Sequence, residues 1–165
     1  LQTEANPEGL PISVFDAIRK GVRDDRSQYW KGLAIPFYGA NRPGANVSQG
    51  LLDQFWLWGM QCGILGAYAS IKAFSETDFT EDLKKMDIPT LVMHGEDDQI
   101  VPVHDAGKKS AKILPNPREI YYAGAPHGLT ATMQDQVNAD LLAFIRGEEL
   151  SHEVTGVGQM AARAT

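Results

Sequence analysis

Apolar positions in the first half of the chain follow the period of α-helices. In the first predicted helix they recur at every fourth residue: Val14, Ile18 and Val22. A loop rich in Gly, Pro and Asn over 35–50 separates this helix from a Trp- and Leu-rich stretch, 51–73. The length of that stretch suits two packed helices that break near Gly59 or Gly63. A short helix is predicted to follow over 80–86.

The second half of the chain changes to a pattern of strands alternating with helices. Residues 89–94 form a short apolar run between Pro and Gly, which is typical of a buried parallel strand. A second strand is predicted over 118–122, and helices are predicted over 105–114 and 134–146. The last helix presents four apolar residues: Val137, Leu141, Leu142 and Ile145. This βα unit, repeated once, predicts an α/β fold.

These patterns divide the chain into three parts. A helical region covers residues 1–86, the βαβα unit covers 87–146, and a tail without a clear period covers 147–165. We expect the tail to fray or to bind a partner. Two strands form only the end of a sheet and leave an unpaired edge that is prone to association. We therefore expect another chain, or an N-terminal half ahead of this one, to complete the sheet, and we leave homo-oligomer formation open.

Composition narrows the kinds of partner. The 165 residues are 43% hydrophobic, and 15 Lys and Arg stand against 21 Asp and Glu, which gives a formal net charge of −6. This acidic chain lacks the basic stripe that nucleic-acid binding needs. The longest apolar stretch, 51–69, is interrupted by polar residues and Gly, so we predict no membrane span. The one cysteine, Cys62, excludes an internal disulfide and is interpreted as a small core residue.

The start of the chain bears on where the protein works. Residues 1–9 have neither a basic beginning nor an apolar core, so they do not resemble a signal peptide. Together with the single cysteine, this predicts a reducing, cytoplasmic location. Because the sequence opens on Leu1 and not on Met, we interpret it as a processed or truncated chain.

Two loops at the ends of the predicted strands carry the candidate chemistry. Asp98 lies in HGEDDQIVP after the first strand, and His127 lies in GAPHGL after the second. The carboxyl ends of parallel strands share one edge, and neighbouring strands are about 4.8 Å apart, so the two side chains can meet. A carboxylate that accepts the Nδ1 hydrogen of a histidine leaves Nε2 free to deprotonate a nucleophile. On spacing alone, such residues are more often unrelated surface groups.

A metal site is the competing interpretation of these loops. The residues that could be drawn around a cation are His94, Glu96, Asp97, Asp98 and His104. They match neither a helical zinc motif nor a calcium-binding loop with its glycine. We therefore predict no metal, and we interpret Glu96 and Asp97 as a solvated acidic loop and His94 as the end of a strand.

Several stretches, in order along the chain, resemble one family of hydrolases: NPEGLP, PFYGANRPGANVSQG, AFSETDFTEDLKKMDIPTLVMHGEDDQIVP, APHG and NADLLAFI. From about Asn6 to about Arg146 the chain is similar to the C-terminal half of an α/β-hydrolase of the cofactor-free bacterial haloperoxidase group, which also contains arylesterases, perhydrolases and a γ-lactamase. The resemblance implies that Asp98, before the Q-I-V-P turn, is the catalytic acid. It implies that His127, in the P-H-G turn, is the catalytic base and that no cofactor is needed.

The resemblance also assigns roles to other parts of the chain. The helical region 1–86 corresponds to the cap, an insertion that covers the active site. Four residues correspond by position to those that line the substrate pocket in relatives: Leu33, Phe37, Ile100 and Val101. For each of these, ordinary core packing is the competing interpretation. The implied substrates are small carboxylic acids, esters or lactams, and the implied activities are those of esterases, perhydrolases and chloroperoxidases.

One part of the family's machinery is missing from the sequence. The nucleophile of an α/β-hydrolase sits in a G-x-S-x-G elbow, and no such motif occurs here. Ser48 precedes a predicted helix and is interpreted as its cap. We therefore expect the chain to be inert alone and active only with an N-terminal segment that brings a serine and an oxyanion hole. The alternative is a non-catalytic binding module or remnant that kept Asp98 and His127 without using them.

Overall fold

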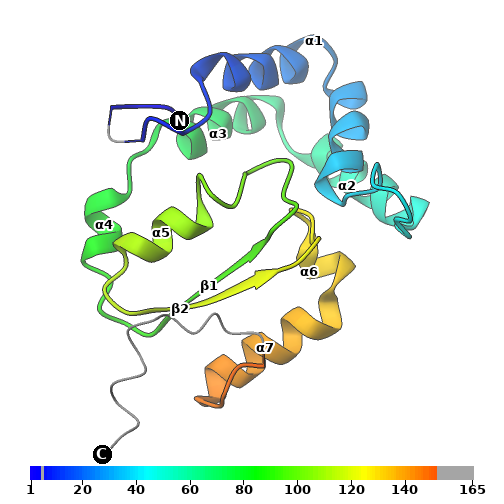
Figure 1. Ribbon diagram of the computed structural model, residues 1–165. Helices are drawn as coiled ribbons and strands as arrows, with labels where there is room; N and C mark the ends of the chain where they lie inside the picture. Colours follow the sequence, from blue (N-terminus) through cyan, green and yellow to red (C-terminus); the bar gives the residue numbers. More distant parts are fainter. Residues whose placement is uncertain (5, 152–165) are drawn as a thin grey trace, which may run out of the picture.

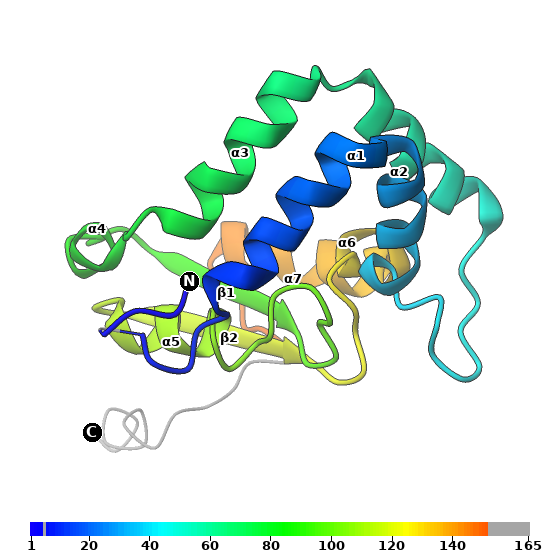
Figure 2. The same cartoon turned by 90° about the horizontal axis from the view of Figure 1, so that it is seen from above.

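The computed structural model describes residues 1–4 and 6–151, so the predicted tail lies mostly outside the described residues. The first half forms four helices, α1 (Ile12–Phe37), α2 (Gln49–Gln61), α3 (Ile64–Glu76) and α4 (Thr80–Lys84). α1 packs against both α2 and α3 (Figures 1 and 2). Its contact with α3 has a buried apolar core made of Phe15, Val22, Ala67 and Ile71. The predicted break near Gly63 is confirmed, because α3 begins directly after it.

α1 extends over the first three residues of the predicted loop 35–50 and is bent. Its backbone leaves the helical conformation at Asp25, with φ −154° and ψ 83°. The Asp25 carboxylate accepts the backbone N–H of Gln28 at 3.0 Å, as an N-cap residue would, and so restarts the helix. The second part of α1 then runs toward the ends of the strands (Figure 1). There the carbonyl oxygen of Phe37 accepts the N–H of Gly128 at 2.8 Å.

The second half contains two strands and three helices, β1 (Thr90–Gly95), α5 (Gly107–Ile113), β2 (Pro117–Tyr122), α6 (Leu129–Thr132) and α7 (Gln134–Arg146). The strands are parallel, with Thr90 opposite Pro117 and Gly95 opposite Tyr122. α5 and α7 lie on opposite sides of the two strands (Figure 1). The predicted α/β order is confirmed, and only the short α6 was not expected. The core of this half consists of Ile120, Tyr122, Ala125, Leu129, Val137 and Leu150.

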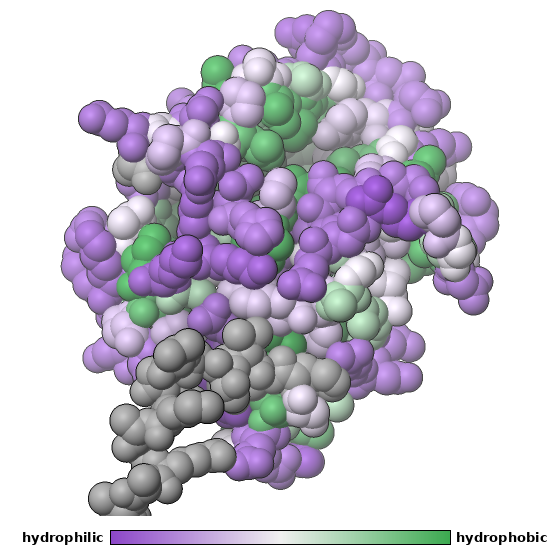
Figure 3. All heavy atoms as spheres, in the orientation of Figure 1, coloured by the Kyte–Doolittle hydropathy of each residue, from purple (hydrophilic) through white to green (hydrophobic). Residues whose placement is uncertain are grey.

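Several expectations about burial are wrong. β1 is half-exposed over residues 90–94, because β2 is its only partner strand in the described part of the chain. Of the four apolar residues that α7 presents, Val137 is buried and the other three are exposed: Leu141, Leu142 and Ile145. Cys62 is exposed, because it ends α2 at the turn into α3. Val14 is also exposed. Hydrophobic side chains accordingly reach the surface among the charged ones in Figure 3.

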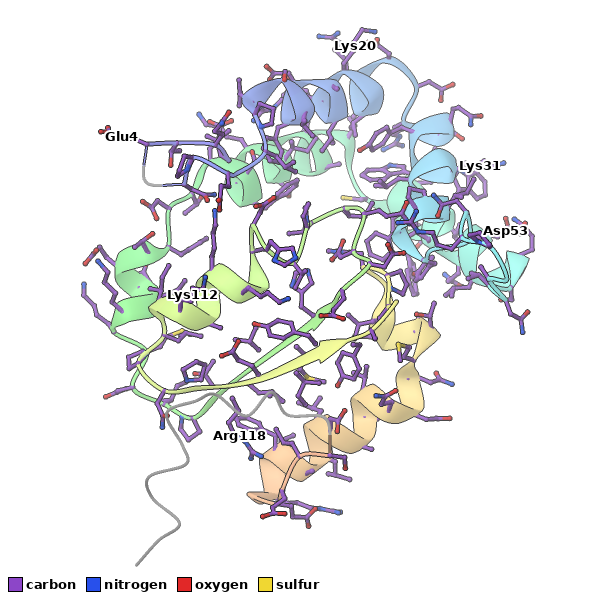
Figure 4. The ribbon with its side chains drawn as sticks, viewed as in Figure 1. Glu4, Lys20, Lys31, Asp53, Lys112 and Arg118 are labelled. Carbon is purple, nitrogen blue, oxygen red and sulfur yellow. The ribbon has the colours of Figure 1, made fainter. Side chains whose placement is uncertain are left out.

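The outer surface of the helical region carries charged side chains as well as exposed apolar ones such as Leu65 and Phe74. Lys20, Lys31 and Asp53 point away from the body of the molecule (Figure 4). No helix that the structure describes combines the length and the apolar character needed to cross a bilayer.

Candidate active site

Asp98 and His127 meet at the carboxyl ends of the paired strands. Asp98 lies in the loop after β1, His127 lies in the loop after β2, and the distance from His127 Nδ1 to Asp98 Oδ2 is 2.7 Å. A carboxylate oxygen can only accept, so Nδ1 carries the hydrogen and Nε2 of the neutral imidazole is a base. The Asp98 side chain is 2% exposed and the His127 side chain 32% exposed, so the acid is buried behind a base that solvent can reach.

Four donors surround the carboxylate of Asp98. Its Oδ1 accepts the backbone N–H groups of Ile100 at 2.9 Å and of Val101 at 2.8 Å, and its Oδ2 faces His127 and His94. Burial acts to raise the pKa of Asp98, but the hydrogen bonds from the two histidines and the two amides outweigh it and hold that pKa well below its usual value. Asp98 is therefore ionised at neutral pH and places a negative charge 2.7 Å from His127 Nδ1.

His94 contributes a contact that the sequence analysis missed. His94 lies one residue before the end of β1 at Gly95, and its Nε2 lies 3.0 Å from Asp98 Oδ2 and 2.9 Å from the carbonyl oxygen of Val101. The hydrogen bond with Asp98 raises the pKa of His94 against the effect of burial. The available signal was its position at the same strand end, four residues before Asp98.

Gly95 allows the two loops to approach each other. A Cβ atom at this position would lie 2.3 Å from the carbonyl oxygen of Ala125, in the loop that carries His127. The same carbonyl accepts the N–H of Asp97 at 3.0 Å. The absence of a side chain at residue 95 thus places the acid loop and the histidine loop in direct backbone contact.

The four predicted pocket residues lie in different surroundings. The ring of Phe37 is 4.7 Å from the His127 ring, centroid to centroid, in an edge-on arrangement. Ile100 and Val101 are half-buried and contact Asp98 through their backbone amides. Leu33 lies in a hollow of α1 whose lining includes neither Asp98 nor His127. The structure therefore brings three of these residues to the pair and leaves Leu33 apart from it.

The loop after α1 is bound to the acid loop on both sides of Asp98. Arg42 donates two hydrogen bonds to the carboxylate of Asp97, at 2.6 and 2.5 Å. Asn41 and Gln99 exchange two amide hydrogen bonds, at 2.9 and 3.0 Å. Asp97 is thus an ion-pair partner and not only a solvated charge. These contacts join residues far apart in sequence, which the pattern of the chain could not predict.

The other residues considered for chemistry have simpler surroundings. Ser48 Oγ accepts the N–H of Leu51 at 3.2 Å, so its predicted role as the cap of α2 is confirmed. His104 is exposed. Over residues 1–4 and 6–151, no group of three or more His, Cys, Asp or Glu side chains is arranged to hold a metal ion.

This fold is that of the C-terminal part of an α/β-hydrolase. A solved bromoperoxidase from Bacillus anthracis superimposes with a TM-score of 0.83 and 34% identity over 88% of this chain and 53% of that one. No protein-family model matches the sequence.

Within that class, the resemblance to the non-heme haloperoxidase group is confirmed by sequence. A non-heme chloroperoxidase from Burkholderia pyrrocinia is 53% identical over 147 residues, and a bifunctional esterase/perhydrolase from Acinetobacter calcoaceticus is 50% identical over 147 residues. Each match covers 88% of this chain and 53% of the relative. The chain is thus similar to the C-terminal half of these proteins and spans about half the length of the curated relatives it matches.

Proposed function

We propose that the chain is the C-terminal segment of a serine-dependent α/β-hydrolase in which His127 is the general base and Asp98 orients it. The observation that carries this proposal is the hydrogen bond between His127 Nδ1 and the buried carboxylate, which leaves Nε2 as the basic nitrogen. Relatives half identical in sequence bear the names of haloperoxidases and of an esterase/perhydrolase, which supports a hydrolase of this type.

The proposed reaction passes through an acyl-enzyme. A serine hydroxyl attacks the carbonyl carbon of a small ester, acid or lactam while His127 Nε2 takes the hydroxyl proton. The bond to the leaving group then breaks as the imidazolium returns that proton to it. Water attacks the acyl-enzyme with His127 again as base, and the carboxylic acid leaves. When hydrogen peroxide replaces water the product is a peracid, which can pass an oxygen atom to a halide and return to the acid.

The serine must come from residues outside this sequence. The chain has no G-x-S-x-G motif, and the hydroxyl of Ser48 is engaged at the start of α2. We assign the nucleophile to an N-terminal segment equivalent to the half of the relatives that this chain does not span. That segment would pair with β1 along the edge that β2 leaves open and would cover the exposed apolar residues of α7.

The helical region is proposed to be the cap. The support is local: the second part of α1 reaches the strand ends, and Phe37 packs its ring against His127. Phe37, Ile100 and Val101 are the proposed pocket residues next to the pair. Leu33, a turn before Phe37, would contribute only if substrate extends along α1.

A chimera tests the proposal. The N-terminal half of the Burkholderia pyrrocinia chloroperoxidase is joined ahead of this chain, and the product is assayed for aryl acetate hydrolysis and for labelling by a fluorophosphonate probe. We expect the chimera to hydrolyse the ester and to react with the probe. Both should be lost in His127→Ala and retained in the matched control His104→Ala. Intact mass spectrometry of the protein from its natural source should also find a serine-bearing segment with the chain.

A folded chimera that neither hydrolyses the ester nor reacts with the probe contradicts the proposal. In that case the non-catalytic binding module, favoured by the missing nucleophile motif, becomes the better interpretation.

A further inference from the structure

Two histidines share one oxygen atom of Asp98. Oδ2 lies 2.7 Å from His127 Nδ1 and 3.0 Å from His94 Nε2, whereas Oδ1 is held by two backbone amides. A catalytic acid that orients a histidine needs only that one imidazole in contact with its carboxylate. The second imidazole therefore calls for a role of its own.

The tautomer of His94 follows from its partners. The carbonyl oxygen of Val101 and the carboxylate of Asp98 are both acceptors, so the Nε2 between them carries a hydrogen. This hydrogen lies between two acceptors of the loop after β1, the carboxylate of Asp98 and the carbonyl oxygen of Val101. The His94 side chain is 14% exposed, so little water reaches the contact to replace it.

We propose that His94 is a positioning residue for Asp98, whose Nε2–H fixes the rotation of the carboxylate so that Oδ2 stays aimed at His127 Nδ1. The two amides hold Oδ1, and His127 contacts Oδ2 but is itself the group that Asp98 has to orient. His94 supplies the second fixed point on the opposite oxygen. The catalytic meaning of this role rests on the proposed function, but its geometry concerns only residues of this chain.

Gly107 packs against His94, so a substitution at residue 107 can displace the His94 ring. A Cβ atom on Gly107, at the start of α5, would lie 2.6 Å from His94 Nδ1 and 3.2 Å from its Cβ. An alanine there must push the imidazole aside, because the atoms it meets belong to a side chain that can move. Gly107→Ala therefore disturbs the contact without replacing His94, Asp98 or His127.

The test reads the tautomer of His127 in the full 165-residue chain and needs neither a nucleophile nor a substrate. Long-range ¹H–¹⁵N NMR spectra of the imidazoles are recorded at about pH 9, where histidine side chains are ordinarily neutral. Protonated and bare ring nitrogens have well-separated ¹⁵N shifts, and the separation shrinks when tautomers mix. The variants are His94→Phe, His94→Gln and Gly107→Ala, and His104→Gln is the matched control.

We expect the parent chain and the His104→Gln control to show a single Nδ1–H tautomer at His127. His94→Phe keeps a ring but removes the donor, so the shift separation should shrink and exchange of the Nδ1 hydrogen with water should quicken about fivefold or more. His94→Gln should retain the parent pattern, because its amide can donate to both acceptors. Gly107→Ala should fall between the two.

An unchanged single tautomer in folded His94→Phe overturns the proposal. So does equal loss in His94→Phe and His94→Gln, because the ring and not its donor would then be responsible. If His94→Phe fails to fold by circular dichroism, Gly107→Ala decides: a parent-like spectrum in that variant is also a refutation. None of these outcomes depends on whether the complete protein hydrolyses an ester, so a failed activity assay leaves this test intact.

Discussion

The strand ends that carry Asp98 and His127 differ sharply from the outer faces of β1 and α7. At the strand ends a buried carboxylate has four donors, and one ion pair and one amide pair flank it and hold its loop. On the outer faces, β1 lacks a second partner strand among the described residues, and Ile145 is 70% exposed. The candidate pair is therefore well ordered, whereas α7 exposes apolar side chains to solvent. The proposed N-terminal segment would cover that face of α7.

Removing the negative charge of Asp98 should have the largest effect on the candidate site. In the chimera, Asp98→Asn should lower kcat by roughly 10³- to 10⁴-fold, because an amide in this place can donate to His127 Nδ1 and select the wrong tautomer. Initial rates of aryl acetate hydrolysis measure the loss.

The neighbouring variant Asp97→Asn is the control, since it changes the same charge one residue away and should lose far less. Equal losses in the two variants would mean that the net charge of the loop matters and the pairing does not.

The interface that we propose on α7 can be tested by adding a charge to its exposed apolar face. Ile145→Lys places a charge on the face that we assign to the N-terminal segment, and it should weaken binding of a separately expressed N-terminal half by about tenfold or more. Leu65→Lys on α3, where the parent side chain is 83% exposed, is the matched control and should leave binding unchanged. Isothermal titration calorimetry of the two halves measures both. Similar weakening by both substitutions would remove the assignment of α7 to that interface.

The same contrast separates what the sequence could predict from what it could not. The strands and helices follow from local patterns. The rule that parallel strands end at one edge allowed Asp98 and His127 to meet, but it was the family resemblance that selected these two residues. The exposure of Leu141 and Ile145 could not be predicted, because apolar periodicity indicates a face to be covered but not which segment covers it. The contacts of Arg42 and Asn41 escaped prediction because they join loops over 50 residues apart.

The ionised form of Asp98 should also contribute to the stability of the fold, and this contribution should depend on pH. The pKa of Asp98 lies below its usual value of 3.8 in the folded chain. Its interactions therefore stabilise the fold fully above the unfolded-state pKa, and this contribution is lost as the pH falls from there toward the lower folded-state pKa. Urea unfolding from about pH 5 down to pH 2.5 should show stability falling with pH, and less steeply in Asp98→Asn. The same slope in the parent chain and in Asp98→Asn would assign the acid sensitivity to other carboxyl groups.

The smallest expected effect concerns the ion pair between Arg42 and Asp97, which joins the helical region to the acid loop. The pair is partly exposed, so its removal should change the unfolding transition little. Its geometry nonetheless restrains a residue adjacent to Asp98, and a shifted loop would misplace the acid relative to His127. In the chimera we expect Arg42→Ala to lower kcat by no more than about tenfold with little change in KM, and Arg42→Lys to restore part of the loss. Arg23→Ala removes another exposed ion pair, with Asp24 on α1, and should leave kcat unchanged. If Arg42→Ala instead raises KM alone, the pair shapes the substrate pocket, and the restraint on Asp98 resides in the backbone amides and His94.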